Sequence, residues 1–388
     1  MKVEQIYSIV NDITSEILGE ENILAEDLSN IVDMGKAVFD NTSVDNYVKS
    51  LLNRIGKVIF VNRPYSGSVP SVLMDSWEYG SVLEKVEAEL PTATENKSWD
   101  LQNGQSYPTD IFYKPTVSAK FYNNKVTFEI PMSFTELQVK ESFGSAAEMN
   151  GFLSMLYNSV DKAMTIKIDG LIQRTINNMI AQTIANEIPD STKYTGIGTV
   201  KAVNLLAQYN QKFGKTLTQA ECINNPEFIR YSAFVIGLYR DRLKKISTLF
   251  NIGGKEKFTP NDLLHSVMLS DFVNASKIYL ESDTYHNEDV ALPTTEVVPY
   301  WQGSGKTYSF TDISSINVLT EGTGEPTAVQ FDGILAVLFD RDSLGVCNTD
   351  RRVTTAYNAR AEFYNNYYKF DCSYFNDTNE NFIVFYAK

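Results

Sequence analysis

Residues 145–187 constrain the fold most, because their apolar side chains recur at steps of three and four, the period of an α-helix. Ser145 and Glu148 form a capping-box pattern, in which the hydroxyl accepts from a backbone amide and the glutamate reaches back. Gly144 and Pro189 flank the run. At a rise of about 1.5 Å per residue the sequence predicts one helix roughly 65 Å long. Its apolar positions are Met149, Phe152, Leu153, Leu156, Val160, Ala163, Met164, Ile168, Leu171, Ile172, Ile176, Met179, Ile180 and Ile184.

A helix with this pattern could also belong to the core of a large bundle or to a coiled coil. The coiled coil is disfavoured, because the apolar spacing keeps no strict heptad and no later segment repeats it. The bundle helix remains open at this point.

The composition is that of an ordinary folded protein. The chain has 388 residues, 43% hydrophobic and 21% charged, which suggests about two or three domains. No segment approaches the ~18 consecutive apolar residues of a membrane span. Asp12 and Glu16 interrupt the place where a signal peptide needs an apolar core, which argues against secretion. Cys222, Cys347 and Cys372 are scattered and odd in number, so we expect buried free thiols in a reducing compartment.

The net charge is −14, from 34 basic and 48 acidic side chains. This excess of acidic side chains argues against a phosphate-binding surface. It suits a body that encloses nucleic acid without binding it tightly, since like charges repel. It equally suits simple solubility.

Residues 1–60 are predicted to be helical and acidic at the start. Two apolar stripes at helical spacing, separated by Gly19, predict short amphipathic helices that dock on a partner or on their own domain. Residues 62–70 then read as a linker. The stripes comprise Ile6, Ile9, Val10, Ile13 and Ile17, and Ile23, Leu24, Leu28, Ile31 and Val32.

Residues 72–134 predict a two-stranded arm with a long polar excursion at 92–110. Two runs of strict apolar–polar alternation, 117–122 and 126–130, are separated by Asn123-Asn124, which tolerates the left-handed geometry of a tight hairpin turn. An isolated hairpin is marginal in water. The arm therefore needs another surface, either its own domain or a neighbouring subunit.

The remaining sequence predicts mixed α and β structure. Residues 200–212 and 226–250 are predicted helices, 264–269 and 273–280 predicted strands, and 331–339 a buried strand. Alternating aromatics predict that the tail, at 363–375 and 382–386, is β structure.

The sequence offers few candidates for chemistry. We expect His265, which sits among apolar residues, to be a satisfied core or edge residue. His286 has no companion at ligand spacing, so a metal site there is disfavoured. Residues 303–307, Gly-Ser-Gly-Lys-Thr, resemble the end of a phosphate-binding loop, but Tyr300 stands where the pattern needs glycine, and a glycine turn is favoured.

Two loops are rich in side-chain oxygens of the kind that bind cations. Neither matches calcium-loop spacing, so cation binding is disfavoured, and no cofactor or catalytic residue is predicted. The loops contain Asp340, Asp342 and Asp350, and Asp377, Asn379 and Asn381.

The order of these parts resembles the major capsid protein of tailed bacteriophages, with the Hong Kong 97 fold. The similarity is strongest over residues 77–188. It rests on the segments 77–91 (WEYGSVLEKVEAELP), 112–121 (FYKPTVSAKF), 126–134 (VTFEIPMSF) and 165–179 (TIKIDGLIQRTINNM), with a weaker match at 333–345.

The resemblance implies an α+β shell subunit without an active site. Its parts would be an N-terminal arm (1–70), an extended loop (71–134), a peripheral domain with its spine helix (135–190), an axial domain (191–290) and a β-rich return (291–388). Copies would form pentamers and hexamers of an icosahedral head in the virion, assembled in the host bacterial cytoplasm around double-stranded DNA without sequence-specific binding. The short N-terminal segment favours a separate scaffold protein, and a portal is implied; no membrane is involved.

The arm carries aromatic candidates for intersubunit contact: Trp99, Tyr107, Phe112 and Tyr113. Packing within the hairpin is the alternative. Lys85, Lys97, Lys114 and Lys120 lie in or near the arm, but no motif selects one for the covalent cross-linking that some capsid proteins use. The rival functions are an encapsulin-type compartment and, in a different class, an enzyme or receptor-binding module with an incidental long helix.

Overall fold

The computed structural model describes residues 69–74, 83–142 except 92 and 97, 144–281, 296–302, 309–321 and 326–388, with the isolated residues 11, 13, 30, 32, 33, 36 and 50. Most of the two predicted N-terminal helices, apart from residues such as Ile13 and Val32, lies outside the described residues, as do most of the linker, His286 and the 303–307 turn.

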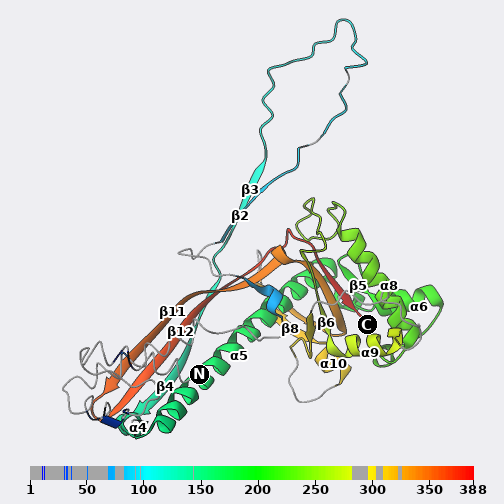
Figure 1. Cartoon of the computed structure of the whole chain (residues 1–388). Coiled ribbons are helices and arrows are strands. Elements are labelled where there is room, and N and C mark those ends of the chain that lie inside the picture. The colour runs from blue at the N-terminus through cyan, green and yellow to red at the C-terminus, as the bar shows by residue number, and fades with distance from the viewer. Residues whose placement is uncertain are drawn as a thin grey trace.

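The predicted long helix is present as α5 (Ala146–Glu187), which runs through most of the molecule (Figure 1). Ser145 is its N-cap, and the Ser145 hydroxyl accepts from the Glu148 amide at 3.2 Å, as the sequence predicts. The first half of α5 buries one stripe of side chains, whereas residues 175–184 are buried on nearly every side. The helix therefore begins at the surface and ends inside the body.

A four-stranded sheet lies along α5, in the order β1-β11-β12-β4. The 3-10 turn η1 (Pro70–Val72) leads into β1 (Leu73–Met74), and α4 (Glu136–Ser142) follows β4. The other strands are β4 (Lys125–Thr135), β11 (Leu344–Asn358) and β12 (Phe363–Asn376). β12 pairs antiparallel with both β11 and β4, so the sheet joins the middle of the chain to its tail.

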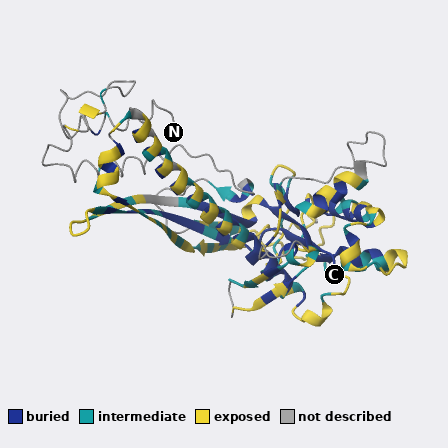
Figure 2. Cartoon of the chain, turned by 90° about the horizontal axis from the view of Figure 1, so that it is seen from below, coloured by how far each residue is buried: buried dark blue, intermediate teal, exposed yellow. Residues whose placement is uncertain are grey.

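A five-stranded sheet forms the second body, in the order β5-β13-β10-β6-β7. β10 and β13 are wholly buried, and Figure 2 shows the buried residues gathered along the sheets with exposed residues on the outer helices. The strands are β5 (Ala202–Asn204), β6 (Leu264–Leu269), β7 (Glu296–Val298), β10 (Ile334–Asp340) and β13 (Phe382–Tyr386).

Short elements surround this sheet. The helices are α6 (Leu205–Phe213), α7 (Gln219–Cys222), α8 (Pro226–Leu243), α9 (Ser270–Glu281) and α10 (Phe310–Ile313). A small hairpin joins β8 (Ile316–Leu319) to β9 (Ala328–Phe331), and η2 (Ser191–Lys193) and η4 (Arg341–Ser343) are single turns.

Three sequence predictions were wrong here. The predicted strand at 273–280 is part of helix α9, whose buried residues Phe272, Val273, Ala275 and Ser276 follow the helical period rather than alternation. The predicted helix at 226–250 ends at Leu243. The predicted helix at 200–212 begins only at Leu205, because the preceding residues form β5 beside β13.

The buried cysteines are as predicted: Cys222, Cys347 and Cys372 are all free thiols. His265 is not satisfied as expected, since both ring nitrogens are buried without a hydrogen-bond partner among the described residues. Burial lowers the pKa of His265, which favours the neutral ring beside Phe339. None of the described helices combines the length and apolar character needed to cross a membrane.

Candidate functional site: a projecting arm and its charged root

A two-stranded arm projects from the body, as Figure 1 shows. It consists of β2 (Leu83–Ala88) paired antiparallel with β3 (Val117–Tyr122), joined by the excursion at 89–116. The two predicted strands at 117–122 and 126–130 exist, but the hairpin predicted between them is wrong. β4 leaves the arm and pairs with β12, so Asn123-Asn124 is the junction between the arm and the four-stranded sheet.

The tip of the arm is open to solvent. The Glu89 amide donates to the Thr116 carbonyl at 2.9 Å and closes the ladder, and a turn with Gly104 at φ 86° lies at the far end. Trp99, Phe112 and Tyr113 are 97%, 84% and 82% exposed.

Of the four predicted contact aromatics, Phe112 and Tyr113 are neighbours in the chain, whereas Trp99 and Tyr107 stand at other places in the excursion. Tyr107, 47% exposed, accepts from the Gln102 amide at 3.1 Å within the tip.

At the root of the arm, the apolar face of the two strands points to solvent and the charged face points to the body, the reverse of the usual arrangement. Alternate side chains of a strand point to opposite faces, and the apolar set points outward: Val86, Val117 and Phe121 are 60%, 57% and 63% exposed. We call this set the outer face; its members are Glu84, Val86, Ala88, Val117, Ala119 and Phe121. The half-buried inner face consists of Leu83, Lys85, Glu87, Ser118, Lys120 and Tyr122.

The inner face meets the body through ion pairs. Three lysines and three carboxylates form what we call the root cluster: Lys85, Lys120, Lys257, Glu87, Asp377 and Glu380. Lys85 Nζ lies 2.8 Å from the buried Asp377 carboxylate and 2.5 Å from that of Glu380. Lys120 Nζ is 3.0 Å from Asp377.

Lys257 extends the cluster from the other side, with its Nζ 2.9 Å from Glu87 and 2.8 Å from Glu380. Strand residues of the arm are thereby tied to the loop between β12 and β13.

The pKa shifts within the cluster favour the charged forms. Burial acts to raise the pKa of Asp377, but the hydrogen bond and charge of Lys85, with further help from Lys120, lower it to about 2. Burial acts to lower the pKa of Lys85, and the bonds from it to Asp377 and Glu380 leave it raised. The pKa of Glu87 is lowered chiefly by Lys257, against burial. Charges of both signs are therefore retained and paired.

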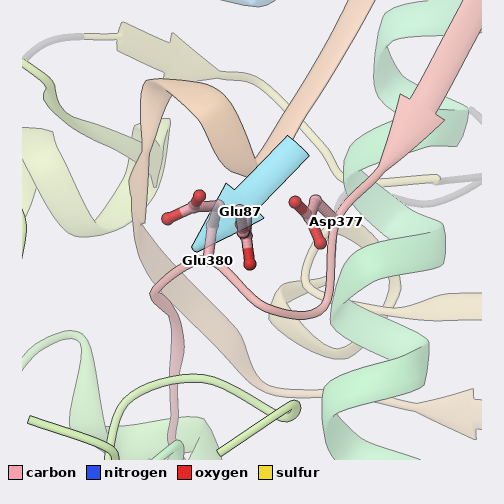
Figure 3. Close-up of side chains that lie close together, drawn as sticks. All are labelled: Glu87, Asp377 and Glu380. Atoms are coloured by element: carbon pink, nitrogen blue, oxygen red, sulfur yellow. The ribbon is translucent and has the colours of Figure 1, made fainter. Parts of the chain in front are cut away.

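The carboxylates of Glu87, Asp377 and Glu380 come within 4.8 Å of one another, a spacing that could hold a metal ion (Figure 3). Their oxygens already bind three ammonium groups, so the cluster is neutral without an ion. One of the two oxygen-rich loops thus places Asp377 beside lysines. In the other, Asp340 accepts from the Asp342 amide at 3.0 Å and the Thr259 hydroxyl at 2.7 Å, as a turn cap.

The root cluster could not be recognised in the sequence, because its members are up to 295 residues apart. A usable signal did exist locally. Lys85 alternates with Val86, and Lys120 with Phe121, so in each strand the lysine and this apolar residue lie on opposite faces. The sequence does not say which of these faces meets the body.

Comparison with known proteins gives the family. Residues 8–386 match the Phi29-like phage major capsid protein family. The major capsid protein of Bacillus phage GA-1 is 22% identical over 205 residues, which are 51% of this chain and 42% of that protein, so the match spans less than half of that relative's length.

Two solved structures support the fold. The capsid structure of Staphylococcus phage Andhra has a TM-score of 0.52 at 10% identity, covering 84% of this chain and 86% of that one. A chain in the structure of head fiber and inner core protein gp22 of bacteriophage P68 has a TM-score of 0.50 at 8% identity, with the same coverage of both chains. The chain therefore belongs to the Phi29-like phage major capsid protein family, a family of structural rather than catalytic proteins, and has the Hong Kong 97 fold.

Proposed function

We propose that this virion shell subunit assembles into pentamers and hexamers of an icosahedral head that encloses double-stranded DNA. The observation that carries the proposal is the inverted arm root. Its apolar outer face is exposed, and its charged inner face is held on its own body. An exposed apolar face of this kind marks a protein contact, and a second copy of the chain is the partner that a shell supplies.

The predicted division of the chain becomes part of the proposal. Residues 135–190 with the four-stranded sheet correspond to a peripheral domain, and 191–290 to an axial domain at the centre of each ring. Residues 71–134 are the extended loop, 291–388 return to both domains, and 1–70 form the N-terminal arm. Support comes from the two sheets, which α5 connects.

At the tip, Trp99, Tyr107, Phe112 and Tyr113 are proposed as anchors on the neighbouring subunit. Aromatic side chains contribute most of the energy in many interfaces, and the exposure of these four leaves them accessible. Contacts that are individually modest add up when each subunit makes several of them. Head-to-tail contacts that close give rings.

The net charge of −14 supports a wall that repels packaged DNA rather than binding it by sequence. A separate scaffold protein, a portal and assembly in the host cytoplasm complete the proposal.

Negative-stain microscopy of the purified chain, with and without the scaffold protein of the same phage, tests it. We expect rings or closed shells. A chain that stays monomeric at high concentration with the scaffold present would contradict the proposal.

A further inference from the structure

A polar cleft of about 830 Å³ lies between the arm root and the second half of α5. Carboxamide side chains from three parts of the chain line it: Asn124, Asn178, Gln182, Asn186 and Asn376. Phe121, Ala185 and Ile252 add apolar atoms to the walls, and the remaining lining residues bear hydroxyl groups or charges, among them Lys120, Tyr122 and Thr378. A carboxamide both donates and accepts hydrogen bonds, so this lining suits a ligand that presents both kinds of group in alternation.

Contacts to Glu321 connect the residues of one wall of the cleft. The Glu321 amide donates to Asn178 Oδ1 at 2.8 Å, and the Tyr374 hydroxyl donates to its carboxylate at 3.1 Å. Arg174 also binds this carboxylate, and Gln182 donates to the Glu321 carbonyl. A site organised before binding loses less entropy when a ligand enters.

Two acceptors are unpaired among the described residues, one in this cleft and one in a neighbouring cleft. Asn376 donates through Nδ2 to the Thr175 carbonyl at 3.2 Å, whereas its buried Oδ1 has no hydrogen-bond partner among the described residues. A second cleft of about 490 Å³ shares Asn178 and Glu321 and is lined by Asn177. Asn177, only 3% exposed, likewise has a buried Oδ1 for which the described chain provides no donor. Buried acceptors are usually paired in folded proteins, so a ligand that brings N–H donors is favoured next to Asn376.

The arm excursion supplies chain of the complementary kind. Residues 110–116 have no secondary structure and are exposed throughout, with Ile111 and Phe112 at 50% and 84%. Their backbone can present N–H and C=O groups in alternation along an extended strand. The arm points away from its own body (Figure 1), so this segment is placed for another subunit rather than for its own cleft.

We propose that the carboxamide cleft binds residues 110–116 of a second copy's arm, with the carboxamides of Asn124 and Asn186 bonding the backbone and the apolar walls receiving Ile111 or Phe112. Phe121 belongs both to the cleft and to the outer face of the arm root, so the two form one continuous docking surface. This inference rests on the proposed shell assembly and specifies where the arm tip is received.

Disulfide trapping between two single-cysteine variants tests the inference. Phe112→Cys protein is co-assembled with Asn186→Cys protein and mildly oxidised, and covalent dimers are counted on non-reducing gels. The matched control is Asn158→Cys, an exposed asparagine on the same helix, roughly 42 Å away at 1.5 Å per residue. The native cysteines are all buried, and each variant alone measures their background.

We expect at least ten-fold more dimer with Asn186→Cys than with Asn158→Cys. Equal yields, or no dimer in well-formed shells, would overturn the cleft assignment while leaving the shell function intact. If Asn186→Cys itself fails to assemble, Asn124→Cys on the opposite wall replaces it with the same expected yield. Failure of the unmodified chain to assemble would instead refute the proposed function, and the inference with it.

Discussion

At the scale of single residues, the root cluster decides how the arm leaves the body. The ammonium groups of Lys85 and Lys120 bind one buried carboxylate, that of Asp377, at 2.8 and 3.0 Å. Buried ion pairs contribute little net stability compared with apolar packing, but removing one partner is costly because the other charge remains. The main effect of the cluster is therefore on the orientation of the arm root. The charged face of β2 and β3 contacts the body, and the apolar face points to solvent.

Asp377→Asn should lower the free energy of unfolding at pH 7 by about 1–3 kcal/mol, because Lys120 loses the carboxylate that it pairs with and Lys85 loses one of its carboxylate partners. The folded pKa of Asp377, about 2, lies below its ordinary 3.8. Its stabilisation is therefore complete above the unfolded pKa and is lost as pH falls from about 5 towards 2. Urea unfolding of the wild-type and Asp377→Asn proteins between about pH 5 and about pH 2 measures the difference in their free energies of unfolding. This difference should become smaller as the pH falls.

Asp262→Asn is the matched control, since Asp262 is exposed, and it should change stability by less than about 0.5 kcal/mol at any pH. A gap between wild type and Asp377→Asn that stays constant down to pH 2 would contradict the pairing of Asp377 with the lysines.

At the scale of elements, α5 changes environment along its length. Near its start only the stripe through Met149, Leu153 and Leu156 is buried, against the four-stranded sheet and its neighbours. Further on, the helix contacts β8, β9 and β13 as well, and polar residues such as Thr175 are buried with it. The helix therefore joins the two sheets mechanically, and its second half should be the less tolerant of substitution.

Ile176→Ala should destabilise the chain by about 2–5 kcal/mol, because Ile176 is 1% exposed and its truncation leaves a cavity. Ile166→Ala, on the same helix but 69% exposed, should cost less than about 1 kcal/mol. Thermal or urea unfolding of the monomer measures both. Similar losses of stability for Ile176→Ala and Ile166→Ala would show that the second half of α5 is not buried as described.

The same helix shows what could be predicted from sequence. Its period and its Ser145 cap are local signals, so its bounds were predicted almost to the residue. Strand pairing is not local: alternation identified β3 and β4, but Asn123-Asn124 suggested that they pair with each other, whereas their partners are β2 and β12. In the site, the sequence left open whether Trp99 and Phe112 pack within the hairpin, and the structure leaves both exposed. The root cluster depends on contacts made only by the folded chain.

At the scale of the whole molecule, the arm separates folding from assembly. Its root is fastened by charges to its own body, so the outer face is not needed to fold the monomer. The same face is apolar and exposed, so it is available to a second copy. Substitutions there should affect association without affecting the stability of the chain.

The double substitution Val86→Ser with Phe121→Ser tests this separation. Both side chains are largely exposed, at 60% and 63%. The free energy of unfolding of the monomer should therefore stay within about 1 kcal/mol of the wild-type value. The concentration at which shells form, measured by light scattering, should rise at least about ten-fold, which corresponds to ~1.4 kcal/mol and is within the range for burying two apolar side chains. Val86→Ile with Phe121→Leu keeps the face apolar and should assemble near the wild-type concentration. Normal assembly of the serine variant would mean that the outer face stays in water in the shell, and that the arm is received through its tip alone.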